Sequence, residues 1–278
     1  MKFILGILLV TFLAQLSCAQ ELFIQTEPAS NMPKGTYGIR LSENTFVADQ
    51  PIKTRSDLEL MYGISPALMA HASVHASNYF GEYGFENVGV YLKYRVFTID
   101  GFKSHFRIAS FLQAAYGGDR NVLPETELES GTSGIRAGLI FTQLENHLAL
   151  SSTIGFAVPF YQHAKWQNVK NLDFSISTGI LVYPREYLGY SDVNLNLYAE
   201  LLGKYFFYNQ VQGVVSGGPP TTILIPSSTM ALDYSIGPQV IINSISRIDL
   251  AFRHRFISPA FTSPTSSIFI RYERMFYH

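Results

Sequence analysis

Histidine and serine residues alternate along one stretch of the chain, a pattern that could bind a metal ion or line a polar surface. His71, Ser73, His75 and Ser77 occupy every second position, so on a strand they share one face. Four strand residues separate His71 from His75 by about 13 Å, whereas zinc ligands lie about 2 Å from the metal. These two histidines therefore cannot bind one zinc ion. Since the other histidines show no short spacing, we expect no metal site.

The composition argues against several other kinds of chemistry. With 20 basic and 21 acidic residues, the net charge is -1, and the basic surface typical of nucleic-acid binding is missing. No glycine-rich phosphate loop occurs, so neither a nucleotide site nor a cofactor is expected. The single cysteine, Cys18, cannot form a disulfide within the chain. Of the 278 residues, 47% are hydrophobic and only 15% are charged, against about 25% charged in soluble domains.

The first residues predict an export signal. Lys2 is followed by an almost unbroken apolar run over 3–16, and Ser17-Cys18-Ala19 is the small-residue pattern of a signal-peptidase site. We expect residues 1–19 to be removed, leaving Gln20 as the mature N-terminus. One alternative is a retained membrane helix, for which the run is short. The other is a lipoprotein acylated at Cys18.

Further along the chain, apolar and polar residues alternate with the period of two that is typical of half-buried strands. The pattern predicts twelve strands, most about 10–14 residues long. They fall at residues 36–42, 57–64, 68–77, 88–97, 106–114, 135–142, 148–158, 172–183, 193–208, 229–242, 247–256 and 267–277.

The connections between these strands alternate in length. The long ones span 43–56, 79–87, 117–133, 159–171, 209–228 and 257–266, and the shorter ones span 65–66, 98–104, 143–146, 183–192 and 243–246. An even number of strands, with short turns at one end and long loops at the other, is typical of outer-membrane barrels. A strand of 12 residues, tilted by about 40°, rises roughly 30 Å, enough to cross the apolar band. The fold class predicted is therefore an all-β, transmembrane, antiparallel up-and-down β-barrel of about twelve strands.

The chain resembles Gram-negative outer-membrane β-barrel proteins in three respects: its export signal, its amphipathic strands and its last strand, 268–277, which ends in aromatic residues. The last strand is similar to the segment that such proteins present to the barrel assembly machinery, although this chain ends at His278 rather than at Phe. The stretch 26–35 resembles uncharacterised transporter-like barrels. The resemblance implies a bacterial outer-membrane location, contact with outer-membrane lipids and both termini in the periplasm. The oligomeric state stays open.

The expected organisation is a signal peptide at 1–19, an N-terminal periplasmic segment at 20–33 and a transmembrane barrel at 34–278. If the apolar faces meet lipid, the opposite faces line the lumen. The basic residues expected there are Arg40, Lys93, Arg95, Arg107, Arg136, Lys204, Arg253, Arg255 and Arg271, and the acidic ones are Glu59, Asp173, Glu200, Asp233, Asp249 and Glu273. The excess of about three positive charges predicts a preference for anions. Alternatively, these side chains pair across a narrow barrel and fill it.

The sequence His75-Ala76-Ser77-Asn78 is similar to the His-x-Ser-Asn element of outer-membrane phospholipases and lipid A deacylases. The resemblance implies that His75 acts as the base for the hydroxyl of Ser77, with Glu82 or Glu86 orienting the imidazole. Two features depart from these families: the pair lies on the face assigned to the lumen, and Tyr79 rather than Gly follows Asn78.

The leading expectation is a channel or transporter for small anionic or neutral solutes, which is not an enzyme. A lipid hydrolase that uses His75 and Ser77 is the first alternative. The second is a closed structural or adhesion barrel that acts through its loops. In that case the acidic residues of 117–133 (Asp119, Glu125, Glu127 and Glu129) and the loop 209–228 are the candidates.

Overall fold

The alternating segments form long antiparallel strands in the computed structural model. It describes residues 23–47, 52–78, 81–101, 103–117, 133–160, 170–184, 192–207, 211–213, 221–223, 230–258 and 266–277. The barrel strands are β1 (Tyr37–Phe46), β2 (Lys53–Gly63), β3 (Leu68–Ser77), β4 (Gly84–Asp100), β5 (Ser104–Gly117), β6 (Gly134–Glu145), β7 (Leu148–Pro159), β8 (Asn171–Tyr183), β9 (Asn194–Phe206), β12 (Met230–Ile242), β13 (Ser246–Ile257) and β14 (Ser266–Phe276). All twelve predicted strands are therefore present, several of them longer than the sequence pattern indicated.

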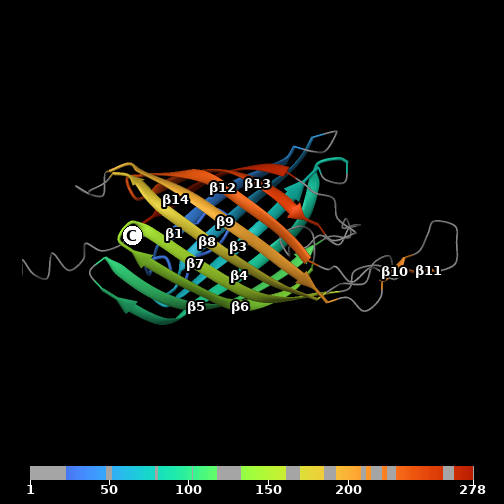
Figure 1. The fold of residues 1–278 in the computed structure, drawn as a ribbon, viewed down its shortest axis with the longest axis horizontal. Helices are drawn as coiled ribbons and strands as arrows, with labels where there is room; N and C mark the ends of the chain where they lie inside the picture. The colour runs from blue at the N-terminus through green and yellow to red at the C-terminus, as the bar shows by residue number, and fades with distance from the viewer. Residues whose placement is uncertain are drawn as a thin grey trace, which may run out of the picture.

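The twelve strands close into one barrel, in which each strand pairs with its neighbours along the chain (Figure 1). The barrel closes where β1 pairs with β14 in antiparallel register, from Tyr37 opposite Phe276 to Phe46 opposite Ser267. This confirms the predicted antiparallel up-and-down barrel. The sequence did not predict the small hairpin of β10 (Val211–Gly213) and β11 (Thr221–Ile223), which forms a separate two-stranded sheet between β9 and β12.

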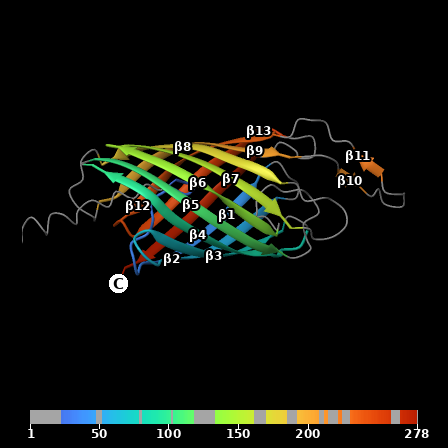
Figure 2. The ribbon, with the colours of Figure 1, turned by 90° about the horizontal axis from the view of Figure 1, so that it is seen from below.

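The connections at one end of the barrel are mostly shorter than those at the other, as predicted. The exception is the connection of ten residues between β8 and β9, which is longer than the six residues between β1 and β2. At the short-turn end, β2 joins β3, β4 joins β5, β6 joins β7, β8 joins β9 and β12 joins β13; the other connections lie at the long-loop end (Figure 2). The tightest turn, between Glu145 and Leu148, places Asn146 at a positive φ of 54°. Asparagine tolerates this conformation better than most residues do.

Large apolar side chains cover the outside of the barrel. Leu60, Val90 and Ile236 are 54–57% exposed, while their chain neighbours turn inward. An apolar outer face on a closed sheet suits the hydrocarbon region of a bilayer, where every backbone polar group must be paired within the protein. Among the residues that the structure describes, no helix is long and apolar enough to cross a membrane.

The chain before β1 lies inside the barrel. We call residues 23–36 the N-terminal segment; Phe23, Ala29 and Met32 in it are at most 3% exposed. The sequence predicts a periplasmic segment at residues 20–33, whereas the described residues 23–33 lie inside the barrel. The alternation of apolar and polar residues does not reveal this segment, because the segment is not a strand. Gly63 makes room for it, since a Cβ atom there would collide with the backbone oxygen of Pro33.

Candidate functional site

The N-terminal segment is held in the lumen by a carboxylate on β9. Glu200 Oε1 accepts hydrogen bonds from the backbone N–H groups of Ile24 at 3.0 Å and Gln25 at 2.7 Å. Its second oxygen accepts hydrogen bonds from the hydroxyl of Thr26 at 2.9 Å and from that of Ser177, on β8, at 3.0 Å. Glu200 therefore satisfies two backbone donors that the segment would otherwise bury without partners.

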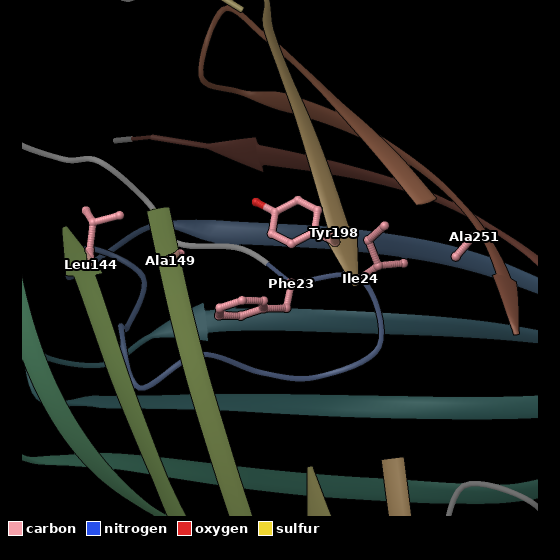
Figure 3. Close-up of a cluster of buried hydrophobic side chains, with 6 residues drawn as sticks. All are labelled: Phe23, Ile24, Leu144, Ala149, Tyr198 and Ala251. Atoms are coloured by element: carbon pink, nitrogen blue, oxygen red, sulfur yellow. The ribbon is translucent and has the colours of Figure 1, made fainter. Parts of the chain in front are cut away.

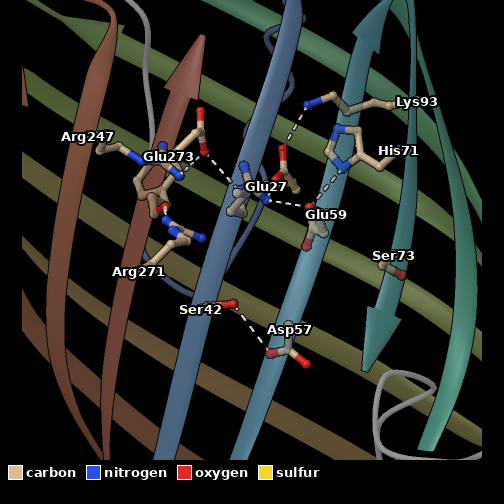
Figure 4. Close-up of polar contacts among 12 residues, drawn as sticks. Glu27, Ser42, Asp57, Glu59, His71, Ser73, Lys93, Arg247, Arg271 and Glu273 are labelled. Carbon is tan, nitrogen blue, oxygen red and sulfur yellow. Dashed lines mark hydrogen bonds and ion pairs between the residues drawn. The ribbon is translucent and has the colours of Figure 1, made fainter. Parts of the chain in front are cut away.

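Glu27, in the middle of the N-terminal segment, enters a network of charges on β1, β2, β4 and β14 (Figure 4). Arg40 bridges three carboxylates: Glu27 at 2.8 Å, Glu59 at 3.0 Å and Glu273 at 2.8 Å. Lys93 lies 3.3 Å from Glu27 and donates to the backbone oxygen of Pro28 at 2.7 Å. Although burial by itself raises the pKa of Glu27, the nearby Arg40 and Lys93 hold it well below the ordinary value.

Two further contacts tie the N-terminal segment to opposite parts of the wall. Arg271, on β14, donates to the backbone oxygen of Phe23 at 2.7 Å, and its Nε lies 2.5 Å from Asp249. Arg107, on β5, donates to Ser30 at 2.8 Å. The segment is thus bound around much of the circumference rather than along one strand.

Apolar contacts complete the filling of the lumen. Phe23 and Ile24 pack with Leu144, Ala149, Tyr198 and Ala251 (Figure 3). The rings of Phe23 and Tyr198 meet edge to face, with centroids 5.6 Å apart. Nearer the short-turn end, Met32 packs with three inward methionines of the wall, Met61, Met69 and Met275. These contacts close the short-turn half of the barrel around the N-terminal segment.

A cavity of about 240 Å³ remains between the N-terminal segment and the long-loop end. We call it the vestibule. Residues 24–27 lie at its base, and most of its wall comes from the long-loop halves of the barrel strands.

One side of the vestibule carries more cations than carboxylates. Asp233, on β12, is shared by Arg253 Nε at 2.8 Å and Arg255 Nε at 2.7 Å, both on β13. Asp173, on β8, accepts a hydrogen bond from Arg136 Nε at 2.9 Å, and Lys204 lies directly opposite Asp173 in the sheet. We call these six residues the basic wall; its four cations and two carboxylates leave two positive charges.

On β2 and β3, three polar side chains of the vestibule are connected in a line. His75 Nε2 lies 2.9 Å from Ser73 Oγ, and His75 Nδ1 lies 2.5 Å from Asp57 Oδ1. Ser42, on β1, donates to the other oxygen of Asp57 at 3.4 Å (Figure 4). This is the order of groups found in a serine nucleophile, its base and an orienting acid.

The structure differs from the sequence interpretation of His75 and Ser77. The hydroxyl of Ser77 donates to Glu86, which also binds Arg55 at 2.7 Å, so Glu86 is not the acid that orients His75. The partner of His75 Nε2 is the preceding serine, Ser73. Ser73 and Ser77 are both two residues from His75, so spacing alone could not decide between them.

Most charged residues predicted to face the lumen lie in these clusters. Those that contact the N-terminal segment directly are Arg40, Lys93, Arg107, Glu200 and Arg271. Those that pair with Arg40 or Arg271 are Glu59, Asp249 and Glu273. The basic wall consists of Arg136, Asp173, Lys204, Asp233, Arg253 and Arg255. Arg95 is half-buried and does not line the vestibule. It lies at a register shift near the short-turn end of β4. The paired arrangement agrees with the alternative in which charges fill the lumen.

Three buried charged residues, Arg55, Glu86 and Arg247, are absent from the set that the sequence pattern assigns to the lumen. For Arg55 a signal existed, because it continues the period of two through Asp57 and Glu59. Glu86 had no such signal. The pairing of β3 and β4 shifts register beside it, and both Glu86 and Asn87 turn inward while Phe85 stays 49% exposed. A bulge of this kind breaks the alternation.

Some predictions concern residues outside the described part of the chain. These are the signal peptide at 1–19, the acidic residues 119, 125, 127 and 129, most of the loop 209–228 and the terminal His278. Within the described residues, no group of three or more His, Cys, Asp or Glu side chains is arranged to hold a metal ion.

Comparisons with known proteins identify the fold. No protein-family model and no curated protein match the chain. An outer membrane channel from Pseudomonas putida F1 superposes with a TM-score of 0.57 at 11% identity, over 91% of this chain and 100% of that chain. The NanC porin gives 0.49 at 9% identity (85% and 98%), and the KdgM porin gives 0.46 at 8% identity (86% and 99%). The likeness to the Pseudomonas putida F1 protein shows that the chain has the fold of an outer-membrane β-barrel.

Proposed function

We propose that this chain is a channel of the bacterial outer membrane that takes small anionic solutes into its vestibule from the long-loop end. Residues 1–19 direct its export, outer-membrane lipids contact its apolar outer face, and β14 presents the signal for the barrel assembly machinery. The likeness of fold to the channel of Pseudomonas putida F1 supports conduction as the general role.

The basic wall is the observation that carries the preference for anions. Its four cationic side chains outnumber its two carboxylates, so the six residues together carry two positive charges. Basic side chains that line a pore favour anions over cations. Fixed charges also act more strongly in a narrow, partly desolvated lumen than at an open surface.

Passage through the barrel requires the N-terminal segment to move, because it fills the lumen below the vestibule. Its polar contacts with the wall are hydrogen bonds and ion pairs, which water and a charged solute can replace. We therefore expect small and intermittent currents rather than the steady conductance of an open pore.

The test is ion selectivity in a planar bilayer, with the refolded chain 20–278 in a salt gradient. The reversal potential should indicate anion preference. Replacing Arg253 and Arg255 by Gln leaves Asp233 unneutralised, so the permeability ratio should shift several-fold toward cations. Arg274→Gln, an exposed residue outside the vestibule, is the control and should leave the ratio unchanged.

Two results would contradict the proposal. A folded barrel that never conducts would refute a channel role. Channels whose selectivity does not respond to the double substitution would refute the role of the basic wall.

A further inference from the structure

We propose that Ser73, His75 and Asp57 form a catalytic triad in the vestibule that hydrolyses small anionic esters. Ser73 is the nucleophile, His75 is the base at 2.9 Å from its hydroxyl, and Asp57 holds the other imidazole nitrogen at 2.5 Å. All three line the vestibule. The inference goes beyond conduction and does not depend on it, and it departs from the expectation that the chain is not an enzyme.

The sheet itself fixes this geometry. Ser73 and His75 are two residues apart on β3 and share the inner face, and Asp57 is directly opposite His75 on β2. Because all three residues belong to paired strands rather than loops, their backbone is held by the sheet. His75 is 2% exposed, so the imidazole is fixed between its two partners instead of pointing into open water.

The space around Ser73 is kept free by a glycine. Gly89, opposite Ser73 on β4, has no side chain, and a Cβ atom there would approach Ser73 Oγ to 2.6 Å. Any larger residue would push the hydroxyl out of line with His75. Gly89 is thus a positioning residue for the nucleophile.

A second histidine supplies a donor for the oxygen that becomes negative during attack. His71 is two residues from Ser73 on the same face, is 6% exposed and also lines the vestibule. Among the described residues, its Nε2 has no hydrogen-bond partner, while its Nδ1 lies 3.4 Å from Glu59. With a hydrogen on Nε2, this imidazole can donate to the substrate oxygen.

The dimensions and charge of the vestibule define the substrate class. A cavity of about 240 Å³ is below the range of roughly 300–1,000 Å³ of sites for drug-sized ligands, so the acyl chain has to be short. The basic wall on β6, β8, β9, β12 and β13 lies across the lumen from β2 and β3. An ester with an anionic group would place that group on the basic wall and its carbonyl at Ser73.

The reaction is ordinary acyl transfer to water. Ser73 Oγ attacks the carbonyl carbon as its proton passes to His75 Nε2, and the carbon–oxygen bond to the alcohol breaks as His75 returns that proton to the leaving oxygen. Water then attacks the acyl-serine and gives a proton to His75. Breaking the acyl–Ser73 bond releases the carboxylic acid, and the same proton restores the Ser73 hydroxyl.

The first experiment is covalent labelling of the refolded chain 20–278 with a small fluorophosphonate, read by intact mass and peptide mapping. The second compares the hydrolysis of p-nitrophenyl acetate with that of the mono-p-nitrophenyl ester of succinic acid, which is anionic. We expect one adduct on Ser73, with faster hydrolysis of the anionic ester. Ser73→Ala should abolish the adduct and lower hydrolysis to the rate in buffer. Ser77→Ala, the matched control, should keep both.

Two further variants separate catalysis from folding. Asp57→Asn should keep the barrel, judged by circular dichroism, but lower hydrolysis by on the order of 10³-fold or more, since it imposes the wrong imidazole tautomer. Gly89→Ala should slow labelling. If a folded wild-type chain takes up no label, or if the label persists in Ser73→Ala, the proposal is overturned. Labelling and hydrolysis report on the triad, whereas bilayer currents of the wild type report on conduction, so failure of the triad and failure of the channel are distinguishable.

Discussion

The carboxylate of Glu200 accepts the backbone N–H of Gln25 at 2.7 Å, although the two residues are 175 positions apart in the chain. The same oxygen accepts the N–H of Ile24. This one side chain therefore fixes the end of the N-terminal segment against the barrel wall, in the place where an open pore would hold water.

Replacing Glu200 by Ala should release this end of the segment. Each hydrogen bond to a charged group contributes about 1.5–3 kcal/mol, so protection of residues 23–26 against hydrogen exchange should fall by roughly tenfold or more. Mass spectrometry of the refolded barrel measures this. Glu145→Gln, on the exposed turn between β6 and β7, is the control. Equal protection in both variants would show that Glu200 does not hold the segment.

A covalent link should show whether conduction needs the segment to move. Thr26 Oγ1 and Ser177 Oγ are 2.8 Å apart, which suits replacement of both residues by Cys in the chain 20–278, which has no other cysteine. We expect the oxidised double variant to conduct less than the wild type, and the reduced form to regain its current. The single variants control for the substitutions. Equal currents in the oxidised and reduced forms would mean that ions pass beside a stationary segment.

Docking of the segment should persist from neutral to mildly acidic pH and weaken only in stronger acid. Because Arg40 and Lys93 outweigh the effect of burial, the pKa of Glu27 lies well below the ordinary 4.5. A lowered pKa stabilises the docked state above the ordinary value, and this contribution is lost as the pH falls through the lowered one. Hydrogen exchange of residues 23–30, corrected for its intrinsic pH dependence, should show this loss. In Glu27→Gln protection should be weaker at pH 7 and lack this acid-dependent step.

The outer face should tolerate charge only near the ends of the strands. Ile236 lies in the middle of β12 and is 57% exposed, and Ile242 is the last residue of the same strand. An Arg at the bilayer midplane costs about 2–4 kcal/mol, and one near the interface costs about 0–1 kcal/mol. Urea unfolding in lipid vesicles should therefore separate Ile236→Arg from Ile242→Arg. Equal stability of the two variants would contradict a lipid-facing β12.

The barrel architecture follows from the local pattern of the sequence. The period of two is a local property of each strand, so it assigns residues such as Leu60 to the outside and Glu59 to the lumen without knowledge of any partner. The alternation of loop lengths indicates which connections lie at each end of the barrel. Both signals survive in the structure because a closed antiparallel sheet joins consecutive strands, and this leaves little freedom in the topology.

The contacts of those inward side chains depend on the folded barrel. Asp57 and His75 meet because β2 and β3 pair in one register, and a shift of one residue would separate them. Glu200 reaches Gln25, and Arg40 reaches Glu27, because the barrel closes around a segment that has no periodic pattern of its own. Contacts across a lumen join residues that are distant in the chain. No local pattern records them, and for that reason the filled lumen and the triad appear only in the folded protein.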